Sequence, residues 1–183
     1  MAFPAFVDTC VLYPAYLCDT LLRLAVAGAY RPLWSADVLE ELGRNLVLRG
    51  IAPERVDRRI DQMNRAFPDA MVRGYETLVA GMENDPKDRH VLAAAVRANA
   101  EAVVTFNLRD FPEPALKPYD LVALHPDEFL LDQLDLHPGL TLDVLEAQAA
   151  SYRREPTTVP GVLALPERAG TPRFAAQARR HLR

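Results

Sequence analysis

Short runs of apolar residues alternate with amphipathic helical stretches over residues 3–135 of this 183-residue chain. The apolar runs cover residues 3–7, 32–35, 102–105 and 121–125. A strand buried on both faces shows a continuous apolar run of this kind, and strands that alternate with helices pair in parallel. The sequence therefore predicts an α/β fold: a parallel sheet flanked by helices, with a C-terminal helical extension.

The helices are predicted from start signals and apolar spacing. The predicted segments are 14–29, 36–49 with Ser35 as its N-cap, 53–67, a helix that starts at Asp85–Pro86, 126–134, 138–154 and a short basic helix at the C-terminus. Residues 68–82 are ambiguous and are predicted as a short helix and a loop. Residues 157–172, rich in proline and glycine, are predicted as a loop. We expect one domain over residues 1–135, with 136–183 as a helical extension too short to form a domain alone.

Composition excludes several classes of protein. Half of the residues are apolar, a quarter are charged and the net charge is −4, which argues against a general nucleic-acid coating protein. No apolar run approaches the roughly 18 residues of a membrane helix, and the N-terminus lacks the basic region of a secretory signal, so we expect a cytoplasmic protein. The two cysteines, Cys10 and Cys18, are too few for a disulfide scaffold and are predicted as core residues.

Acidic residues stand where the predicted strands end. Asp8 follows the first strand, and Asn107 and Asp110 follow the third. Glu41 lies one turn into the helix after the second strand, and Asp88 lies in the first turn of a later helix. Because functional sites of parallel α/β sheets form at the carboxyl ends of the strands, we expect these side chains to converge.

Converging carboxylates repel one another, so they either keep protons or bind cations. Oxygen-only ligands suit the hard cations Mg²⁺ and Mn²⁺. Such an ion keeps bound water and can promote attack of that water on a phosphate. The residues alone therefore predict metal-dependent phosphodiester chemistry.

Four stretches carry a family resemblance: FVDTCVLYP, WSADVLEEL, NDPKDRHVLAAA and VVTFNLRDFP, in this order. Together they resemble PIN-domain proteins and, more narrowly, the VapC-type ribonuclease toxins of bacterial toxin–antitoxin pairs. The resemblance implies that residues 1–135 form a PIN-like nuclease domain. It implies an endoribonuclease that hydrolyses RNA phosphodiesters with Mg²⁺ or Mn²⁺, a cognate antitoxin protein as partner, and a homodimer to which the helix of residues 14–29 contributes.

The resemblance also assigns roles. Asp8 and Asp88 would hold the principal metal ion, Glu41 would orient or deprotonate the attacking water, and Asn107 or Asp110 would complete the site. The metal ligands implied are thus Asp8, Asp88 and Asp110. Many relatives carry Asp where this chain has Asn107, and a neutral oxygen ligand would hold a second metal ion more weakly. The auxiliary residues implied are Thr9, Asp85 and Thr105.

Simpler interpretations stand beside these. Asp8, Asp85 and Asp88 could cap turns or helices, since acids favour helix N-termini. Glu40, not Glu41, could be the acid that faces the site. Asp110 could be an ordinary loop acid.

The basic and aromatic residues have two interpretations as well. The candidates for contact with the RNA backbone are Arg44, Arg58, Arg65 and Arg89. A solvated helix face paired with nearby acids explains most of these arginines equally well. Tyr13 and Trp34 could stack on bases but are expected to be packing residues. For the whole chain, the alternative function is a catalytically degenerate PIN-fold module that binds RNA or protein.

Overall fold

The computed structural model describes residues 2–182, whose contacts group them into two compact units. Unit 1 contains residues 2–13 and 31–124, and unit 2 contains residues 14–30 and 125–182. The two units separate at residues 124 and 125, so residues 125–135 group with the C-terminal helices. The domain boundary at residue 135 stays a prediction. No helix within residues 2–182 is long and apolar enough to cross a membrane.

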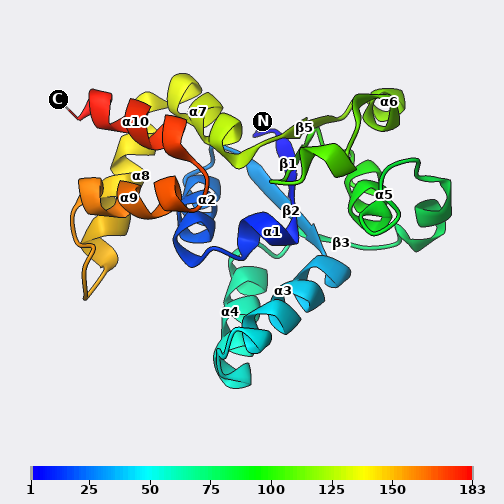
Figure 1. Ribbon diagram of the computed structural model, residues 1–183, viewed down its shortest axis with the longest axis horizontal. Helices are drawn as coiled ribbons and strands as arrows, with labels where there is room; N and C mark the ends of the chain where they lie inside the picture. Colours follow the sequence, from blue (N-terminus) through cyan, green and yellow to red (C-terminus); the bar gives the residue numbers. More distant parts are fainter. Residues whose placement is uncertain (1, 183) are drawn as a thin grey trace. The chain divides into compact units, whose positions relative to one another are not determined.

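Unit 1 is built on a five-stranded sheet. Its strands are drawn as arrows in Figure 1. The strands are β1 (Pro4–Val7), β2 (Arg31–Ser35), β3 (Met71–Val72), β4 (Ala102–Val104) and β5 (Val122–Leu124). They run in the order β3-β2-β1-β4-β5, and every neighbouring pair is parallel. The parallel α/β sheet predicted from the sequence is confirmed. Chain order reverses between β1 and β4, and this switch point is where a ligand site is expected.

Strand β3 is the strand that the sequence analysis did not predict. It lies in the ambiguous segment 68–82 and has two residues, too few to show a pattern of alternation. The strand is fixed by pairing with β2, and just before it the Trp34 N–H donates to the Ala70 carbonyl at 3.0 Å. A short 3₁₀ helix, η1 (Glu76–Gly81), follows it.

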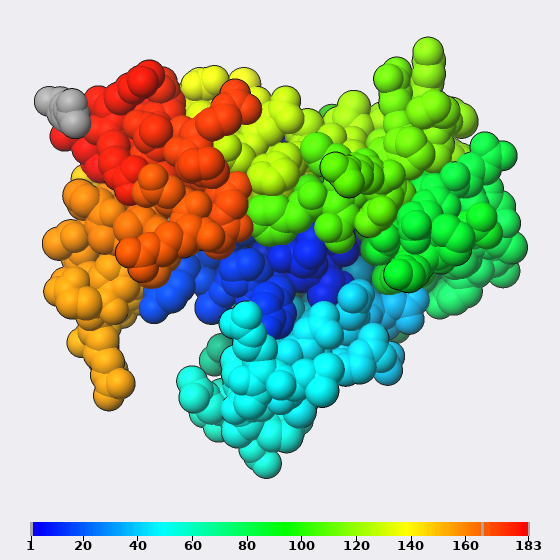
Figure 2. Space-filling model, viewed as in Figure 1, coloured from blue at the N-terminus to red at the C-terminus, as the bar shows by residue number. Residues whose placement is uncertain are grey.

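The helices of unit 1 are α1 (Thr9–Leu12), α3 (Ala36–Leu48), α4 (Pro53–Ala66), α5 (Arg89–Arg97) and α6 (Glu113–Leu116), with 3₁₀ turns η2 (Leu108–Asp110) and η3 (Lys117–Tyr119). Ser35 caps α3 as predicted, because its hydroxyl accepts the Val38 N–H at 3.3 Å. Helix α5 begins at Arg89, later than predicted, because residues 85–88 form a turn in which the Asp88 N–H donates to the Asp85 carbonyl. Its buried face, rich in alanine, packs against β1, β2 and β4. In Figure 2 the α3–α4 pair, coloured cyan, stands out from the rest of this unit.

Among the described residues, unit 2 consists of five helices: α2 (Ala15–Val26), α7 (Pro126–Leu136), α8 (Pro138–Ser151), α9 (Val159–Arg168) and α10 (Pro172–His181). The loop predicted for residues 157–172 is wrong, because most of it forms α9. Thr158 caps α9, Pro160 lies in its first turn where proline is tolerated, and Val162 and Leu163 are fully buried. Burial of this apolar pair outweighs the local proline and glycine signal.

The apolar face of α2 is used inside unit 2. Leu17, Leu21 and Leu24 are buried, and α2 packs against α8 and α9. These three side chains are covered within unit 2, and the contribution of this helix to a homodimer stays a prediction. The homodimer itself stays a prediction as well.

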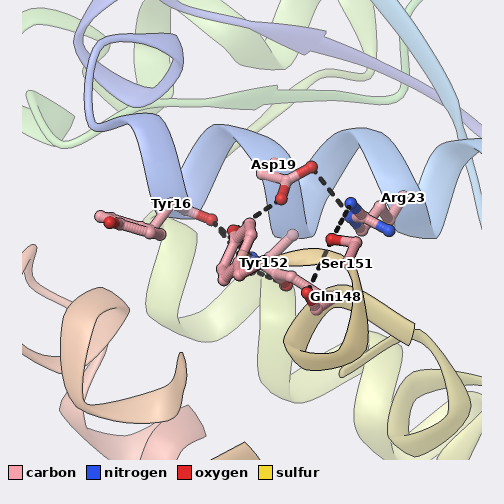
Figure 3. A network of polar contacts seen from close by, with 7 residues as sticks. Tyr16, Asp19, Arg23, Gln148, Ser151 and Tyr152 are labelled. Carbon is pink, nitrogen blue, oxygen red and sulfur yellow. Dashed lines mark hydrogen bonds and ion pairs between the residues drawn. The ribbon is translucent and has the colours of Figure 1, made fainter. Parts of the chain in front are cut away.

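Polar contacts also join α2 to the end of α8 (Figure 3). The Tyr152 hydroxyl donates to Asp19 Oδ2 at 2.6 Å and accepts from Gln148 Nε2 at 2.8 Å. Asp19 pairs with Arg23 at 2.9 Å. The buried Thr20 hydroxyl donates to Gln148 Oε1 at 2.8 Å. These hydrogen bonds and the ion pair connect side chains of α2 with side chains at the end of α8.

Tyr152→Phe is expected to destabilise the protein by about 1–2 kcal/mol, because it leaves both the Gln148 amide and Asp19 without a partner that they now have. The control is Tyr119→Phe, which removes the hydroxyl of a tyrosine that is 38% exposed. Its effect should stay within about 0.5 kcal/mol. Urea unfolding of the two variants measures the difference. Equal midpoints would show that the network contributes nothing to stability.

Candidate active site

Asp8 lies at the switch point of the sheet. It directly follows β1, and its N–H donates to the carbonyl of Val104 at the end of β4. Asp8 stands at the N-cap position of α1, but its carboxylate accepts no N–H of that helix. Instead its Oδ2 accepts the Thr105 hydroxyl at 2.7 Å, and the residue is only 3% exposed. The capping interpretation therefore does not explain this buried carboxylate.

Glu41 is tied to the same corner through Thr9. The Thr9 hydroxyl donates to Glu41 Oε2 at 2.9 Å, which joins the first residue of α1 to the second turn of α3. Glu41 is half-buried, whereas Glu40 is exposed. This arrangement favours Glu41 over Glu40 as the acid of α3 that serves the site.

Asp88 stands at the N-cap position of α5 and, like Asp8, makes no capping hydrogen bond with its side chain. Burial, together with the charges of Asp8, Asp110 and Asp85 and a hydrogen bond to Asp110, raises the pKa of Asp88 to about 7. Three other carboxylates therefore act on this one, as the sequence analysis expected of a convergent cluster. With a pKa of about 7, the Asp88 carboxyl is only about half ionised at neutral pH.

The loop after β4 supplies the remaining candidates. Asp110 ends η2 beside Asp88, and its carbonyl accepts the Asp85 N–H at 3.1 Å. Asn107 is exposed, and its backbone N–H donates to the Thr105 hydroxyl at 3.0 Å. Asp85 caps its own turn by accepting the Lys87 N–H at 3.0 Å. The geometry thus favours Asp110 over Asn107 as the residue that joins Asp8, Glu41 and Asp88 in the site.

The oxygen-only donor set fits a hard cation. Within residues 2–182 no three histidine, cysteine or acidic side chains stand together as a ready-made metal site. Yet Asp8, Asp85 and Asp110 all raise the pKa of Asp88, and that repulsion is what a bound cation would relieve. Carboxylate oxygens are the ligands that Mg²⁺ and Mn²⁺ prefer. Asp8, Asp88 and Asp110 are therefore the residues that fit such an ion.

The predicted RNA-contact residues lie in different surroundings. Arg44 and Arg58 are exposed on α3 and α4, and Arg89 is half-buried beside Asp88. Arg65 is 82% exposed and lies 3.9 Å from Asp61, one helical turn away. Arg44 and Arg58 therefore present an exposed positive charge. Arg65 can be explained equally well as part of a solvated helix face paired with Asp61.

The aromatic candidates differ in the same way. Trp34 is fully buried, stacks edge-on against Phe67 and donates from Nε1 to Asn64 Oδ1 at 3.1 Å. It is a packing residue, as expected, and cannot stack on a base. Tyr13 is half-buried with the Arg49 guanidinium 5.5 Å from its ring centre.

One residue of this site was missed by the sequence analysis. Cys10, expected to be a core residue, lies with its Sγ 3.1 Å from Asp8 Oδ2 and donates to it. Burial, and then the charge of Asp8, raises the pKa of the Cys10 thiol to about 12. The available signal was its place two residues after Asp8, in the first turn of the helix for which Asp8 stands at the N-cap position.

Comparison with known proteins agrees with this fold. The profile of the PIN domain matches residues 4–109, which is more than half of the chain, so the chain belongs to the PIN-domain family. The profile of the VapC50 C-terminal domain matches residues 126–180.

A relative from Mycobacterium tuberculosis bears the name "Putative ribonuclease VapC50". It is 54% identical over 112 residues, which cover 61% of this chain and 65% of that protein. The match thus spans just under two thirds of the relative. No solved structure matches the chain.

Proposed function

We propose that this protein is a Mg²⁺- or Mn²⁺-dependent endoribonuclease that hydrolyses RNA phosphodiesters and acts as the toxin of a toxin–antitoxin pair. The observation that carries the proposal is the cluster of Asp8, Asp88 and Asp110 at the switch point, with Glu41 tied beside it through Thr9. The name of the M. tuberculosis relative, which calls that protein a ribonuclease, supports the same activity.

Each residue has a part in this reaction. A bound Mg²⁺ or Mn²⁺ would supply an activated water and neutralise charge on the phosphate. Asp8, Asp88 and Asp110 would hold the ion, and Asp88 would do so in its deprotonated form. Glu41, held by Thr9, accepts the proton of the attacking water. Thr105 fixes the orientation of the Asp8 carboxylate through its 2.7 Å hydrogen bond.

Purified protein, freed of any bound partner and incubated with total cellular RNA, tests the activity. We expect cleavage with Mn²⁺ or Mg²⁺ and none with EDTA. A matched control is Asp69→Asn, since Asp69 is exposed and precedes β3 at the opposite edge of the sheet. Cleavage that persists in EDTA would contradict the metal-dependent mechanism. RNA binding without any cleavage would favour the degenerate module instead.

The exposed arginines of α3 and α4 are proposed to bind RNA phosphates. Replacing Arg44 or Arg58 by Gln should weaken binding of single-stranded RNA and reduce the slope of log Kd against log salt by about 0.7 for each phosphate that the protein no longer neutralises. Fluorescence anisotropy in EDTA measures binding without cleavage. Arg31→Gln is the control, because Arg31 is exposed at the amino end of β2, away from the acidic cluster. Unchanged slopes in both variants would assign these arginines to a solvated face.

The remaining proposals concern partners. A cognate antitoxin protein is proposed to insert an Arg or Lys side chain among the carboxylates, because a cation from the partner would relieve the same repulsion as a metal ion. We also propose a homodimer and a cytoplasmic location, where RNA is available as substrate. Copurification with the product of a neighbouring short reading frame tests the antitoxin, and light scattering tests the homodimer.

A further inference from the structure

Two hydrogen-bond relays end on the same oxygen atom of Asp8. In the first, the Asn107 N–H donates to Thr105 Oγ1 at 3.0 Å, and the Thr105 hydroxyl donates to Asp8 Oδ2 at 2.7 Å. In the second, the Phe106 N–H donates to Cys10 Sγ at 3.4 Å, and the Cys10 thiol donates to the same Oδ2 at 3.1 Å. Two successive backbone amides of the loop after β4 are thus connected to one carboxylate oxygen.

This arrangement gives the two oxygens of the Asp8 carboxylate different roles. A carboxylate oxygen has about two lone-pair sites, and Oδ2 meets two donors. Both of these side-chain hydrogen bonds end on Oδ2, so Oδ1 is the oxygen left for a cation. Hydrogen bonds that orient a metal ligand in this way set its direction and its affinity.

The two donors, Cys10 and Thr105, also lie in contact with each other. Their Sγ and Oγ1 atoms lie 3.5 Å apart, and Cys10 belongs to α1 whereas Thr105 follows β4. The pair therefore locks the Asp8 carboxylate between the two elements that form the switch point.

We propose that Cys10 is a positioning residue of the metal site: its thiol, acting with the Thr105 hydroxyl, binds Asp8 Oδ2 and so presents Oδ1 to Mg²⁺ or Mn²⁺. This inference rests on the proposed function, because it requires that Asp8 be a metal ligand. It assigns to Cys10 no contact with RNA and no part in proton transfer.

The test compares Cys10→Ala, which removes the donor, with Cys10→Ser, which keeps one. Cys10→Ala should raise the Mn²⁺ concentration for half-maximal RNA cleavage about tenfold while the rate at saturating Mn²⁺ stays within about threefold of wild type. Cys10→Ser should restore the wild-type Mn²⁺ requirement. Cys18→Ala is the matched control, since it removes a buried thiol on α2. Calorimetric titration with Mn²⁺ alone should show the same ranking.

The outcomes separate this inference from the proposed function. If the wild-type protein and Cys10→Ala bind Mn²⁺ equally well, the role of Cys10 is wrong and the proposed nuclease is untouched. The same conclusion follows if Cys10→Ser is as defective as Cys10→Ala, because packing would then explain the loss. If the wild-type protein neither binds Mn²⁺ nor cleaves RNA, the proposed function fails, and the role of Cys10 fails with it.

A second readout needs neither metal nor RNA. In Cys18→Ala the remaining thiol is Cys10, and its S–H stretching band in the infrared reports its hydrogen bond directly. The band should lie at lower frequency than that of a solvent-exposed thiol and shift upward when Asp8→Ala is added. A band that does not move would show that the thiol does not donate to Asp8.

Discussion

Asp8→Asn is expected to lower the rate of RNA cleavage about a thousandfold or more, because it removes the charged ligand at the centre of the site. The fold should survive. The amide of Asn has nearly the shape of the carboxylate, and its oxygen can still accept from Thr105 and Cys10, which lie 2.7 and 3.1 Å from Asp8 Oδ2. What is lost is the negative charge that holds a divalent cation.

Single-turnover cleavage at saturating Mn²⁺ measures this effect, with thermal unfolding as the check on folding. Asp69→Asn, the exposed control, should cleave RNA at the wild-type rate. In bacterial cells, toxicity of the expressed protein should disappear together with cleavage. If Asp8→Asn cleaves within tenfold of the wild-type rate, Asp8 does not hold the metal ion on which the chemistry depends.

Asp88→Asn should have the second large effect on cleavage, and it should change activity and stability in opposite directions. Its rate of cleavage should fall by a similar factor, because a second metal ligand is lost. Its metal-free stability, however, should rise. In the wild type, burial and the neighbouring acids raise the pKa of Asp88 from 3.8 to about 7, so its charged form is unfavourable in the folded protein. The neutral amide of the variant would carry no charge to destabilise the cluster.

The sign of the pH dependence follows from these values. The unfolded chain releases the Asp88 proton near pH 3.8 and the folded protein near pH 7, so the folded state binds more protons between them. The free energy of unfolding of the metal-free protein should therefore fall as the pH rises from about 4 to about 7, and level off above. At pH 8, Asp88→Asn should be more stable than the wild type by on the order of 1 kcal/mol, after allowance for solvent screening of this half-exposed group.

Urea unfolding in EDTA at pH 5 and pH 8 tests this prediction. The stability of the wild type relative to Asp88→Asn should fall between pH 5 and pH 8. The Mn²⁺ affinity of the wild type should also decrease by up to about tenfold per pH unit below pH 7, because the ion must displace the proton. A wild-type protein whose metal-free stability rises between pH 5 and pH 8 would contradict the account of Asp88.

The positions of the acids could be predicted from the sequence because they depend on local rules. A short apolar run ending in Asp8 predicts both a buried strand and the edge at which that acid lies. The same reasoning placed Glu41 and Asp88 near one edge without knowledge of the strand order. Convergence follows from parallel topology, and parallel topology follows from alternation of strands and helices.

Other features depend on contacts between residues far apart in the chain. Strand β3 exists because β2 pairs with it, and its two residues carry no pattern of their own. Helix α9 forms because Val162 and Leu163 are buried in unit 2, against a local sequence that favours a loop. The choice of Asp110 over Asn107 depended on how η2 turns after β4, which no spacing rule determines.

Cys10 shows the same limit within the site. Its apolar neighbours in the sequence predict a core residue, and it is indeed half-buried. Its function in the proposed site comes from Thr105 and Phe106, which are brought to it by β4 across the switch point. Side chains that orient a ligand are recognised from three-dimensional contacts far more readily than from motifs.

The central claim is that the carboxylates of this site direct a water molecule onto an RNA phosphate through a bound metal ion. The chemical ends of the products test it most directly, because attack by water breaks the bond to the 3′ oxygen. The account predicts fragments with 5′-phosphate and 3′-hydroxyl ends, formed with Mn²⁺ even where a 2′-deoxynucleotide occupies the cleavage position. Products with 2′,3′-cyclic phosphate and 5′-hydroxyl ends, lost on 2′-deoxy substitution, would show attack by the ribose and contradict the account.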